Sequence, residues 1–202
     1  MIGTIRKNLM VVMIMLATMV SLVLVIAQVA RAEDITPSTS LTGSGNEADP
    51  FLIATAADLA YMRDRVIANE GMITPSGGGT SVEAKTAHYK LTADIVLGYW
   101  QDNDEDGIVD DGEINNTTSG GVAYVESNWT PIGEVGSGNN WQGTFDGNGH
   151  IVSGIYINTS SDDQGLFGVV ENGTIKNLGV KDSYIKGGWN VGGIAGSSSG
   201  TI

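Results

Sequence analysis

The sequence predicts an all-β protein, a right-handed parallel β-helix (a solenoid) with an N-terminal capping helix, preceded by a signal peptide. Gly149-His150-Ile151, Gly173-Thr174-Ile175 and Gly200-Thr201-Ile202 recur along the chain, with steps of 24 and 27 between them. Gly165-Leu166-Phe167-Gly168 and Gly193-Ile194-Ala195-Gly196 lie 28 residues apart. A period of about 20–50 residues is typical of solenoids, in which each unit buries its apolar face only against its neighbours.

The repeats also predict the core. Ile151, Ile175 and Ile202 should stack in one column, and the short β segments around them are separated by glycine and asparagine corners, which tolerate positive φ. Inward positions of one coil should match those of the next, namely Ile151, Ile155 and Ile157 with Ile175, Leu178 and Val180. A β-propeller is the main alternative, but its blades need about 40–50 residues each, more than this spacing provides.

Residues 1–32 have the features of an export signal. Arg6 and Lys7 precede an apolar run from Leu9 to Ala27, and Ala30-Arg31-Ala32 is a small-residue cleavage site. We therefore expect a mature N-terminus at Glu33. The alternative is a retained signal anchor, because the apolar run approaches the length of roughly 20 residues that a helix needs to span a bilayer.

Composition narrows the class of protein further. Cleavage would leave 170 residues with seven basic and 23 acidic side chains, a net charge of about −16. This charge excludes nucleic acid and anionic membrane surfaces as partners, so we expect membrane contact only through an uncleaved signal segment. The chain has no cysteine, so an exported form must be stabilised by its core or by metal.

The mature chain divides into three parts in this prediction. Residues 33–48 form a linker, residues 49–127 an N-terminal cap region, and residues 128–202 the β-helix repeats, truncated at the C-terminus. Since the chain ends in the middle of a coil, we expect it to be the N-terminal part of a longer protein. The linker should be extended or mobile, because residues 35–46 are rich in Ser, Thr and Gly.

The cap region contains the one helix expected in the mature chain, residues 55–69. Thr55 should cap it, with Asp58 three residues on, and Leu59, Met62 and Val66 form an apolar stripe. The helix should cover the first coil, whose open β edge would otherwise invite aggregation. After it, residues 88–97 alternate as one strand would, with Tyr89, Leu91, Ala93 and Ile95 on one side.

A calcium-binding loop is the strongest chemical motif. Residues 102–113 match the twelve-residue EF-hand loop, with a glycine, Gly107, at the sharp turn of position 6. The predicted ligands at positions 1, 3, 5, 7, 9 and 12 are Asp102, Asp104, Asp106, Ile108 through its carbonyl, Asp110 and Glu113. The flanks lack paired helices, so we expect a Ca²⁺ loop inserted between β elements, without the helix pair that could open as a switch.

For the other candidate residues, a structural role is favoured over metal binding, catalysis or sugar binding. His88 and His150 are the only histidines and lack the neighbours of a zinc site, and His150 is expected to be a solvated turn residue. Four aspartates, Asp94, Asp146, Asp162 and Asp163, could pair as glycosidase acids only if the fold brings them together. The aromatic residues, which are Trp100, Trp129, Trp141, Trp189, Tyr99, Tyr124 and Tyr156, either form a sugar-stacking platform or pack at the ends of coils, and packing is favoured.

Several segments together resemble GLUG-motif bacterial surface proteins. The resemblance extends over residues 43–202 and is carried by Trp129-Thr130-Pro131-Ile132-Gly133, Gly143-Thr144-Phe145-Asp146-Gly147-Asn148-Gly149-His150, Gly165-Leu166-Phe167-Gly168, Ile175-Lys176-Asn177-Leu178-Gly179-Val180 and Val191-Gly192-Gly193-Ile194-Ala195-Gly196. It implies a parallel β-helix in a large exported protein, sometimes beside an IgA-specific metallopeptidase or adhesin modules. The H-E-x-x-H motif of that peptidase is missing here, and the calcium loop is an insertion relative to the family pattern.

The sequence therefore predicts a secreted, extracellular protein associated with the cell surface. It would act as a structural stalk or adhesion platform with one bound Ca²⁺, its partner a host or cell-surface glycan or protein. No catalytic residue and no small-molecule substrate are evident in the chain itself, although a catalytic module could follow its C-terminal end. The alternatives are a β-helical polysaccharide-active enzyme and a non-catalytic arm of a surface metallopeptidase.

Overall fold

The computed structural model describes residues 38–68, 71–100, 106, 114–115, 128–133 and 138–202. All of them belong to one compact unit, which comprises residues 36–117 and 123–202. The predicted signal peptide and the first residues of the predicted linker lie outside the described residues. Among those that are described, no helix is both long and apolar enough to cross a membrane.

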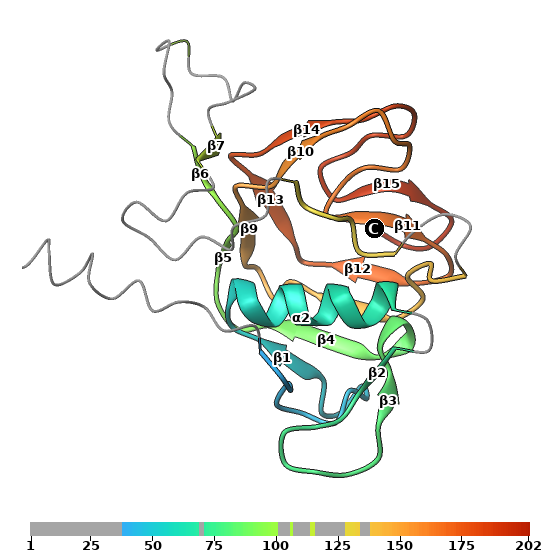
Figure 1. Ribbon diagram of the computed structural model, residues 1–202. Helices are drawn as coiled ribbons and strands as arrows, with labels where there is room; N and C mark the ends of the chain where they lie inside the picture. Colours follow the sequence, from blue (N-terminus) through green and yellow to red (C-terminus); the bar gives the residue numbers. More distant parts are fainter. Residues whose placement is uncertain (1–37, 69–70, 101–105, 107–113, 116–127, 134–137) are drawn as a thin grey trace, which may run out of the picture. The chain divides into compact units, whose positions relative to one another are not determined.

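The described part of the chain is mostly β-strand, with one α-helix and several parallel sheets (Figure 1). The largest sheet has the order β1-β4-β8-β12, and the others are β13-β9-β5, β10-β14 and β11-β15. The bounds of these strands are β1 Phe51–Ile53, β4 His88–Leu91, β5 Ile95–Val96, β8 Thr144–Asp146, β9 Ile151–Ser153, β10 Tyr156–Asn158, β11 Phe167–Val170, β12 Thr174–Lys176, β13 Gly179–Lys181, β14 Tyr184–Lys186 and β15 Ala195–Ser198.

Two short antiparallel pairs and one turn of 3-10 helix complete the described elements. Strand β2 (Met72–Ile73) pairs with β3 (Val82–Glu83), which leads into the 3-10 helix η1 (Ala84–Thr86). Strand β6 (Tyr99–Trp100) pairs with β7 (Ile114–Asn115). Both pairs are local excursions of the chain, whereas the parallel sheets join segments distant in sequence.

A column of side chains in the four-stranded sheet forms the centre of the core. Phe51 is the register partner of Tyr89, Tyr89 of Phe145, and Phe145 of Ile175, and all four are buried. The rings of Phe51 and Tyr89 lie 5.6 Å apart, a separation favourable for tilted aromatic pairs. Burial raises the pKa of the Tyr89 phenol well above its ordinary value, and the hydroxyl donates to the Ala84 carbonyl at 2.9 Å.

The spacing of 28 predicted from the two glycine-bracketed motifs is confirmed. Phe167 pairs in parallel with Ala195, one such spacing later, so strand β11 lies on β15 with the two motifs in register. The same offset joins Tyr156 to Tyr184 in β10 and β14. Thr174 also bridges Thr201 in parallel, so the second of the two steps between the similar tripeptides is confirmed as well.

The first of those two steps, from Ile151 to Ile175, does not correspond to a strand pairing. The predicted column is therefore wrong at these two residues. Ile151 pairs with Gly179 in another sheet, whereas Ile175 pairs with Phe145, so Ile151 and Ile175 do not share a column. The similar tripeptides lead into strands of different sheets, β9 and β12, and the partner of Ile175 is Phe145, six residues before Ile151. The corner between β8 and β9 contains a turn closed by a hydrogen bond from His150 N to Gly147 O at 2.8 Å. It is two residues longer than the corner between β12 and β13, so the offset is 30 from Phe145 to Ile175 and 28 from Ile151 to Gly179.

The strand register in the other parallel sheets differs from the remaining pairs of inward residues that the sequence predicts. In the sheet β13-β9-β5, Val152 lies between Ile95 and Val180. Ile157, predicted to match Val180, instead pairs with Ile185. Valine and isoleucine thus still stack on similar side chains, as parallel pairing of half-buried strands requires.

The segment predicted as one strand, residues 88–97, forms two. Tyr89 and Leu91 are buried in β4, but a bend at Thr92 and Ala93 turns the chain, and Ile95 is buried in a different sheet. The alternation continues across the bend because both strands present apolar residues to the same core. The pattern therefore identified these buried residues and missed the corner between them.

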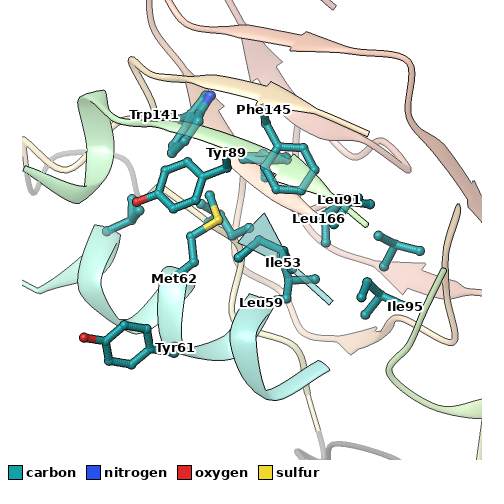
Figure 2. Packing of buried hydrophobic residues seen from close by; sticks show 14 of the residues in the cluster. Ile53, Leu59, Tyr61, Met62, Tyr89, Leu91, Ile95, Trp141, Phe145 and Leu166 are labelled. Carbon is teal, nitrogen blue, oxygen red and sulfur yellow. The ribbon is translucent and has the colours of Figure 1, made fainter. Parts of the chain in front are cut away.

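The helix α2 (Ala56–Ile67) agrees with the predicted one to within two residues at its C-terminal end. Thr55 Oγ1 accepts from Asp58 N at 3.1 Å, and the Asp58 carboxylate accepts from Thr55 N at 3.0 Å, so the predicted capping box is confirmed. Leu59, Met62 and Val66 are buried. Figure 2 shows Leu59 and Met62 pointing toward Ile53 and Tyr89.

Two contacts fix α2 to the segment that follows the calcium-loop insertion. Asn139 Nδ2 donates to the Ile67 carbonyl at 2.9 Å, which satisfies one of the carbonyls left open at a helix end. The guanidinium of buried Arg63 lies 4.7 Å from the centre of the Trp129 ring. The helix is thus attached to residues far away in the chain.

Part of the predicted linker is packed rather than mobile. Leu41 is buried and bridges Pro75, and Thr42 O accepts from Leu52 N at 2.8 Å. Gly43 adopts a φ of 102°, and a Cβ there would meet the Pro50 carbonyl, so the segment folds tightly back on β1. Its Ser, Thr and Gly composition predicts a loop, and buried Leu41 together with backbone hydrogen bonds holds that loop against the fold.

Substituting a residue of the buried column tests the observed register. We expect Phe145→Ala to lower the free energy of unfolding by about 3–5 kcal/mol, because removing a fully buried aromatic ring leaves a cavity. Urea unfolding followed by circular dichroism measures the change. The matched control is Thr144→Ala, the neighbouring half-exposed residue on the opposite face of β8. Equal unfolding midpoints for the two variants would contradict the register.

Candidate functional site

The predicted calcium loop lies almost wholly outside the described residues. Of its six predicted ligands, Asp106 alone is described, as an exposed residue in a bend, and Asp102, Asp104, Ile108, Asp110 and Glu113 are not. Within the described part of the chain, no group of three or more His, Cys, Asp or Glu is placed to hold a metal ion. The calcium site stays a prediction of the sequence motif.

The strands that flank that loop are described, and they pair with each other. Trp100 is the register partner of Ile114 in the antiparallel pair β6–β7. Opposed residues of such pairs lie about 4.5–5.5 Å apart, so the segment between them starts and ends at one place. The outermost predicted ligands, Asp102 and Glu113, follow and precede these strands closely in sequence. This agrees with the expected insertion between β elements.

A cavity of about 450 Å³ lies beside strand β10. Its described lining is mostly polar and comes from residues 128–133, the end of β10 and the loop that follows β10. Asn128 Oδ1 accepts from Asn158 N at 2.6 Å, which ties the first segment to the strand. The lining residues are Asn128, Trp129, Thr130, Pro131, Gly133, Ile157, Asn158, Thr159, Ser161, Asp162, Asp163 and Gln164.

The tryptophans divide between core and surface. Trp129 and Trp141 are buried, and the Trp129 indole donates from Nε1 to the Leu166 carbonyl at 3.1 Å, so the packing role favoured from the sequence is confirmed for these two. Trp189 is 80% exposed. Tyr156 is half-buried and stacks on Tyr184, with ring centroids 5.7 Å apart. The side chains of Trp100, Tyr99 and Tyr124 lie outside the described residues.

The loop that carries Trp189 is held by residues that line the cavity. Trp189 N donates to Asp162 Oδ1 at 2.7 Å, and Asp163 N donates to the Trp189 carbonyl at 2.8 Å. Asn190 Nδ2 donates to Asp163 Oδ1 at 2.9 Å. A Cβ at Gly188 would lie 2.6 Å from the backbone carbonyl oxygen of Ser160, so glycine is favoured at this close approach. The backbone of Trp189 is therefore bonded to two residues that line the cavity, Asp162 and Asp163.

The four aspartates considered as glycosidase acids are not gathered at one place. Asp162 and Asp163 line the first cavity. Asp146 lines a second hollow of about 530 Å³ on the outer face of the four-stranded sheet, along with His88 and Lys90. Asp94 is exposed and accepts from His150 Nδ1 at 3.0 Å.

His150 accordingly joins two corners that are distant in sequence. The sequence predicts a solvated turn residue, but His150 is half-buried and holds Asp94 from the preceding strand connection. Hydrogen bonds from Ile151 N and from His150 lower the pKa of Asp94 below its ordinary value. The carboxylate therefore stabilises the corner in its ionised form.

Asp146 is also held ionised. Partial burial raises its pKa, but hydrogen bonds from Asn177 Nδ2 and Asn148 N, together with the Lys176 ammonium, outweigh that effect and leave the pKa below its ordinary value. A general acid of a glycosidase needs a raised pKa instead. Asn177 belongs to the corner after β12, the parallel partner of β8, so this contact joins the corners of two paired strands.

Comparison with known proteins gives two distant relatives. A protein described as a Gly-rich membrane protein of Evansella cellulosilytica is 30% identical over 145 residues, which is 71% of this chain and 12% of that protein. Halomucin of Haloquadratum walsbyi is 29% identical over 178 residues, 84% of this chain and 2% of that protein. The chain thus spans only a small fraction of either relative's length.

The comparisons with families and structures return no match. No family model matches the chain, so the resemblance to GLUG-motif proteins stays a prediction. No solved structure matches it either. Both relatives are surface-type proteins that are much longer than this chain.

The depressed pKa of Asp146 predicts a loss of stability in acid. A carboxyl whose folded-state pKa lies below its unfolded value contributes stability above about pH 3.9 and loses that contribution as the pH falls through the folded pKa. Urea midpoints at pH 5 and pH 2.5 should therefore differ less for Asp146→Asn than for the natural protein. Asn177→Gly, which keeps the positive φ of that corner and removes the hydrogen bond, should also reduce the difference. Identical pH dependence in all three proteins would refute this assignment.

Proposed function

We propose that the chain is part of an exported surface protein whose strands form successive coils of a right-handed parallel β-helix, serving as a stalk or adhesion platform. The parallel register carries this proposal. Strands on several faces pair with strands one spacing of about 28 further along the chain, and the corners between them face one another. Parallel strands joined by crossovers are right-handed in about 98% of cases, which supports the hand.

The corners provide a second argument for stacked coils. Asn148, Asn177, Asp163 and Asn190 all adopt positive φ, and they form two pairs at equivalent corners of successive coils. Asn177 donates to Asp146 and Asn190 to Asp163, so side-chain amides join one corner to the next. An arrangement of this kind, continued along a stack, would resist bending, as a rigid stalk requires.

The proposed surface location draws on the N-terminal segment and the relatives. Residues 1–32 have the pattern of an export signal, and the two relatives are described as a Gly-rich membrane protein and as halomucin. The resemblance to GLUG-motif surface proteins points the same way. The role proposed is structural, because Asp94 and Asp146 have depressed pKa values and bond their own chain.

We propose in addition that residues 102–113 bind Ca²⁺ and order the insertion between β6 and β7. The loop alternates carboxylates as six- to eight-coordinate calcium requires, and its neighbouring strands are already paired. Pairing of the flanks brings the ends of the loop together before the ion binds, which lowers the loop-closure entropy that binding must overcome.

Surface exposure can be measured on intact cells. An epitope-tagged form of the full chain, produced in a bacterial host, should be digested when protease is added outside the cells, while a cytoplasmic marker stays intact. Deleting residues 2–32 should protect the tagged chain, because it would no longer be exported. Protection of the unaltered chain, with the tag retained inside the cells, would refute the surface assignment.

Calcium binding can be tested by thermal unfolding of the purified chain with Ca²⁺ or with chelator. At a Ca²⁺ concentration of 100 times Kd, binding to the folded state alone would add about 2.7 kcal/mol of stability. Glu113→Gln should abolish the difference, because it removes the bidentate ligand. Glu105→Gln removes an acid of the same loop that is not a predicted ligand, and should retain it. Equal melting of the natural protein in both conditions would rule out the site.

A further inference from the structure

We propose that the cavity lined by Asn128, Asn158 and Asp162, together with exposed Trp189, whose backbone is bonded to two residues of the lining, binds a neutral glycan chain. The inference rests on the proposed surface function, because it names the class of ligand that such a platform would hold. The coil architecture and the calcium loop do not depend on it.

Trp189 is the most exposed large apolar side chain among the described residues. Its backbone is nevertheless fixed by the hydrogen bonds to Asp162 and Asp163 and by the tight approach at Gly188. Because the backbone is already held, a ligand that covers the ring has to order only the two side-chain torsions of Trp189. The flat, apolar face of an indole suits the C–H-rich face of a pyranose ring, and aromatic residues with one polar edge are frequent anchors of binding sites.

The cavity beside Trp189 supplies hydrogen-bonding groups. Its volume of about 450 Å³ lies within the range of about 300–1,000 Å³ found for ligand pockets. Asn128, Asn158 and Gln164 contribute amides, which both donate and accept, and Thr130 and Ser161 contribute hydroxyls. Such a mixture of donors and acceptors matches the hydroxyl groups of a sugar better than it matches an apolar ligand.

The charge of the cavity lining indicates which class of glycan the cavity would bind. The described lining contains two acidic residues, Asp162 and Asp163, and no Lys, Arg or His. The whole chain has a net charge of −13 at pH 7, which adds to the repulsion of an anion. Uronate, sialylated and sulfated glycans are therefore disfavoured, whereas the carboxylates can accept hydrogen bonds from the hydroxyls of a neutral sugar.

The outer face of β10 and β14 extends the site beyond one sugar unit. Tyr156 and Asn158 lie on the same face of β10, opposite to buried Ile157, and Tyr184 stacks on Tyr156 from the next coil. Asn158 Nδ2 donates to the Tyr156 hydroxyl at 3.4 Å, so the tyrosine pair adjoins a residue that lines the cavity. A glycan of several units could contact the cavity and this stacked pair together.

Calorimetric titration with defined oligosaccharides tests the proposal. The probes are the neutral hexaoses of cellulose, mannan and xylan, with hexagalacturonate as the anionic counterpart of similar length. We expect at least one neutral hexaose to bind and hexagalacturonate to bind more weakly or not at all. Trp189→Ala should weaken the binding at least about tenfold, since a large aromatic anchor dominates such sites.

Further variants distinguish loss of the Trp189 contact with the glycan from loss of the folded structure. Trp189→Phe should bind with intermediate affinity, and Asn158→Ala should bind more weakly than the natural protein. Met72→Ala removes another exposed apolar side chain, in β2, and should bind as the natural protein does. Unfolding temperatures of the Trp189 variants should equal that of the natural protein, because the ring is exposed.

Three outcomes would overturn the proposal: no neutral hexaose binds, Trp189→Ala binds unchanged, or hexagalacturonate binds more tightly than the neutral chains. A dimer that sedimentation equilibrium detects and that Trp189→Ala abolishes would overturn it as well, because the ring would then contact a second copy. Failure of glycan binding leaves cell-surface proteolysis and calcium-dependent melting as separate readouts of the proposed function.

Discussion

Parallel pairing between segments distant in sequence is the constraint on which the rest of the structure depends. It places Phe51, Tyr89, Phe145 and Ile175 in one buried column, and no one strand could bury its own apolar face. Burial of a side chain therefore depends on its neighbours along the column. Val152 is fully buried between Ile95 and Val180, whereas Val180, which has Val152 as its register partner, is half-buried.

Sequence-based prediction was most informative where the determining interactions are local. The capping box of α2 needs only Thr55 and Asp58, three residues apart, and the prediction located both. The spacing of 28 also agrees with the pairing of β11 with β15. The predicted column of Ile151 and Ile175 is wrong because the two similar tripeptides lead into strands of different sheets, β9 and β12. A comparison of tripeptides does not reveal which sheet each strand joins.

The two candidate sites also differ in whether local sequence is sufficient to locate them. A calcium loop is a contiguous motif, so its residues could be named from the sequence, and the pairing of β6 with β7 is what the structure adds at its flanks. The cavity is assembled from residues 128–133, β10 and the following loop, and no local pattern marks it. Trp189 was recognised only as one of several aromatic residues. The position of its backbone depends on contacts of Gly188 and Trp189 with residues 160–163, which are distant in sequence.

The inward and outward faces of these strands are under different constraints. Inward positions must match the side chain of the paired strand, so a change such as Phe145→Ala is expected to leave a cavity. Outward positions such as Tyr156, Asn158 and Lys186 are constrained only by their neighbours on the surface. Backbone pairing fixes where these side chains lie without fixing what they are. Parallel pairing can therefore hold the backbone of a residue as exposed as Trp189 in a defined position, since its hydrogen bonds are made with Asp162 and Asp163, which are distant in sequence.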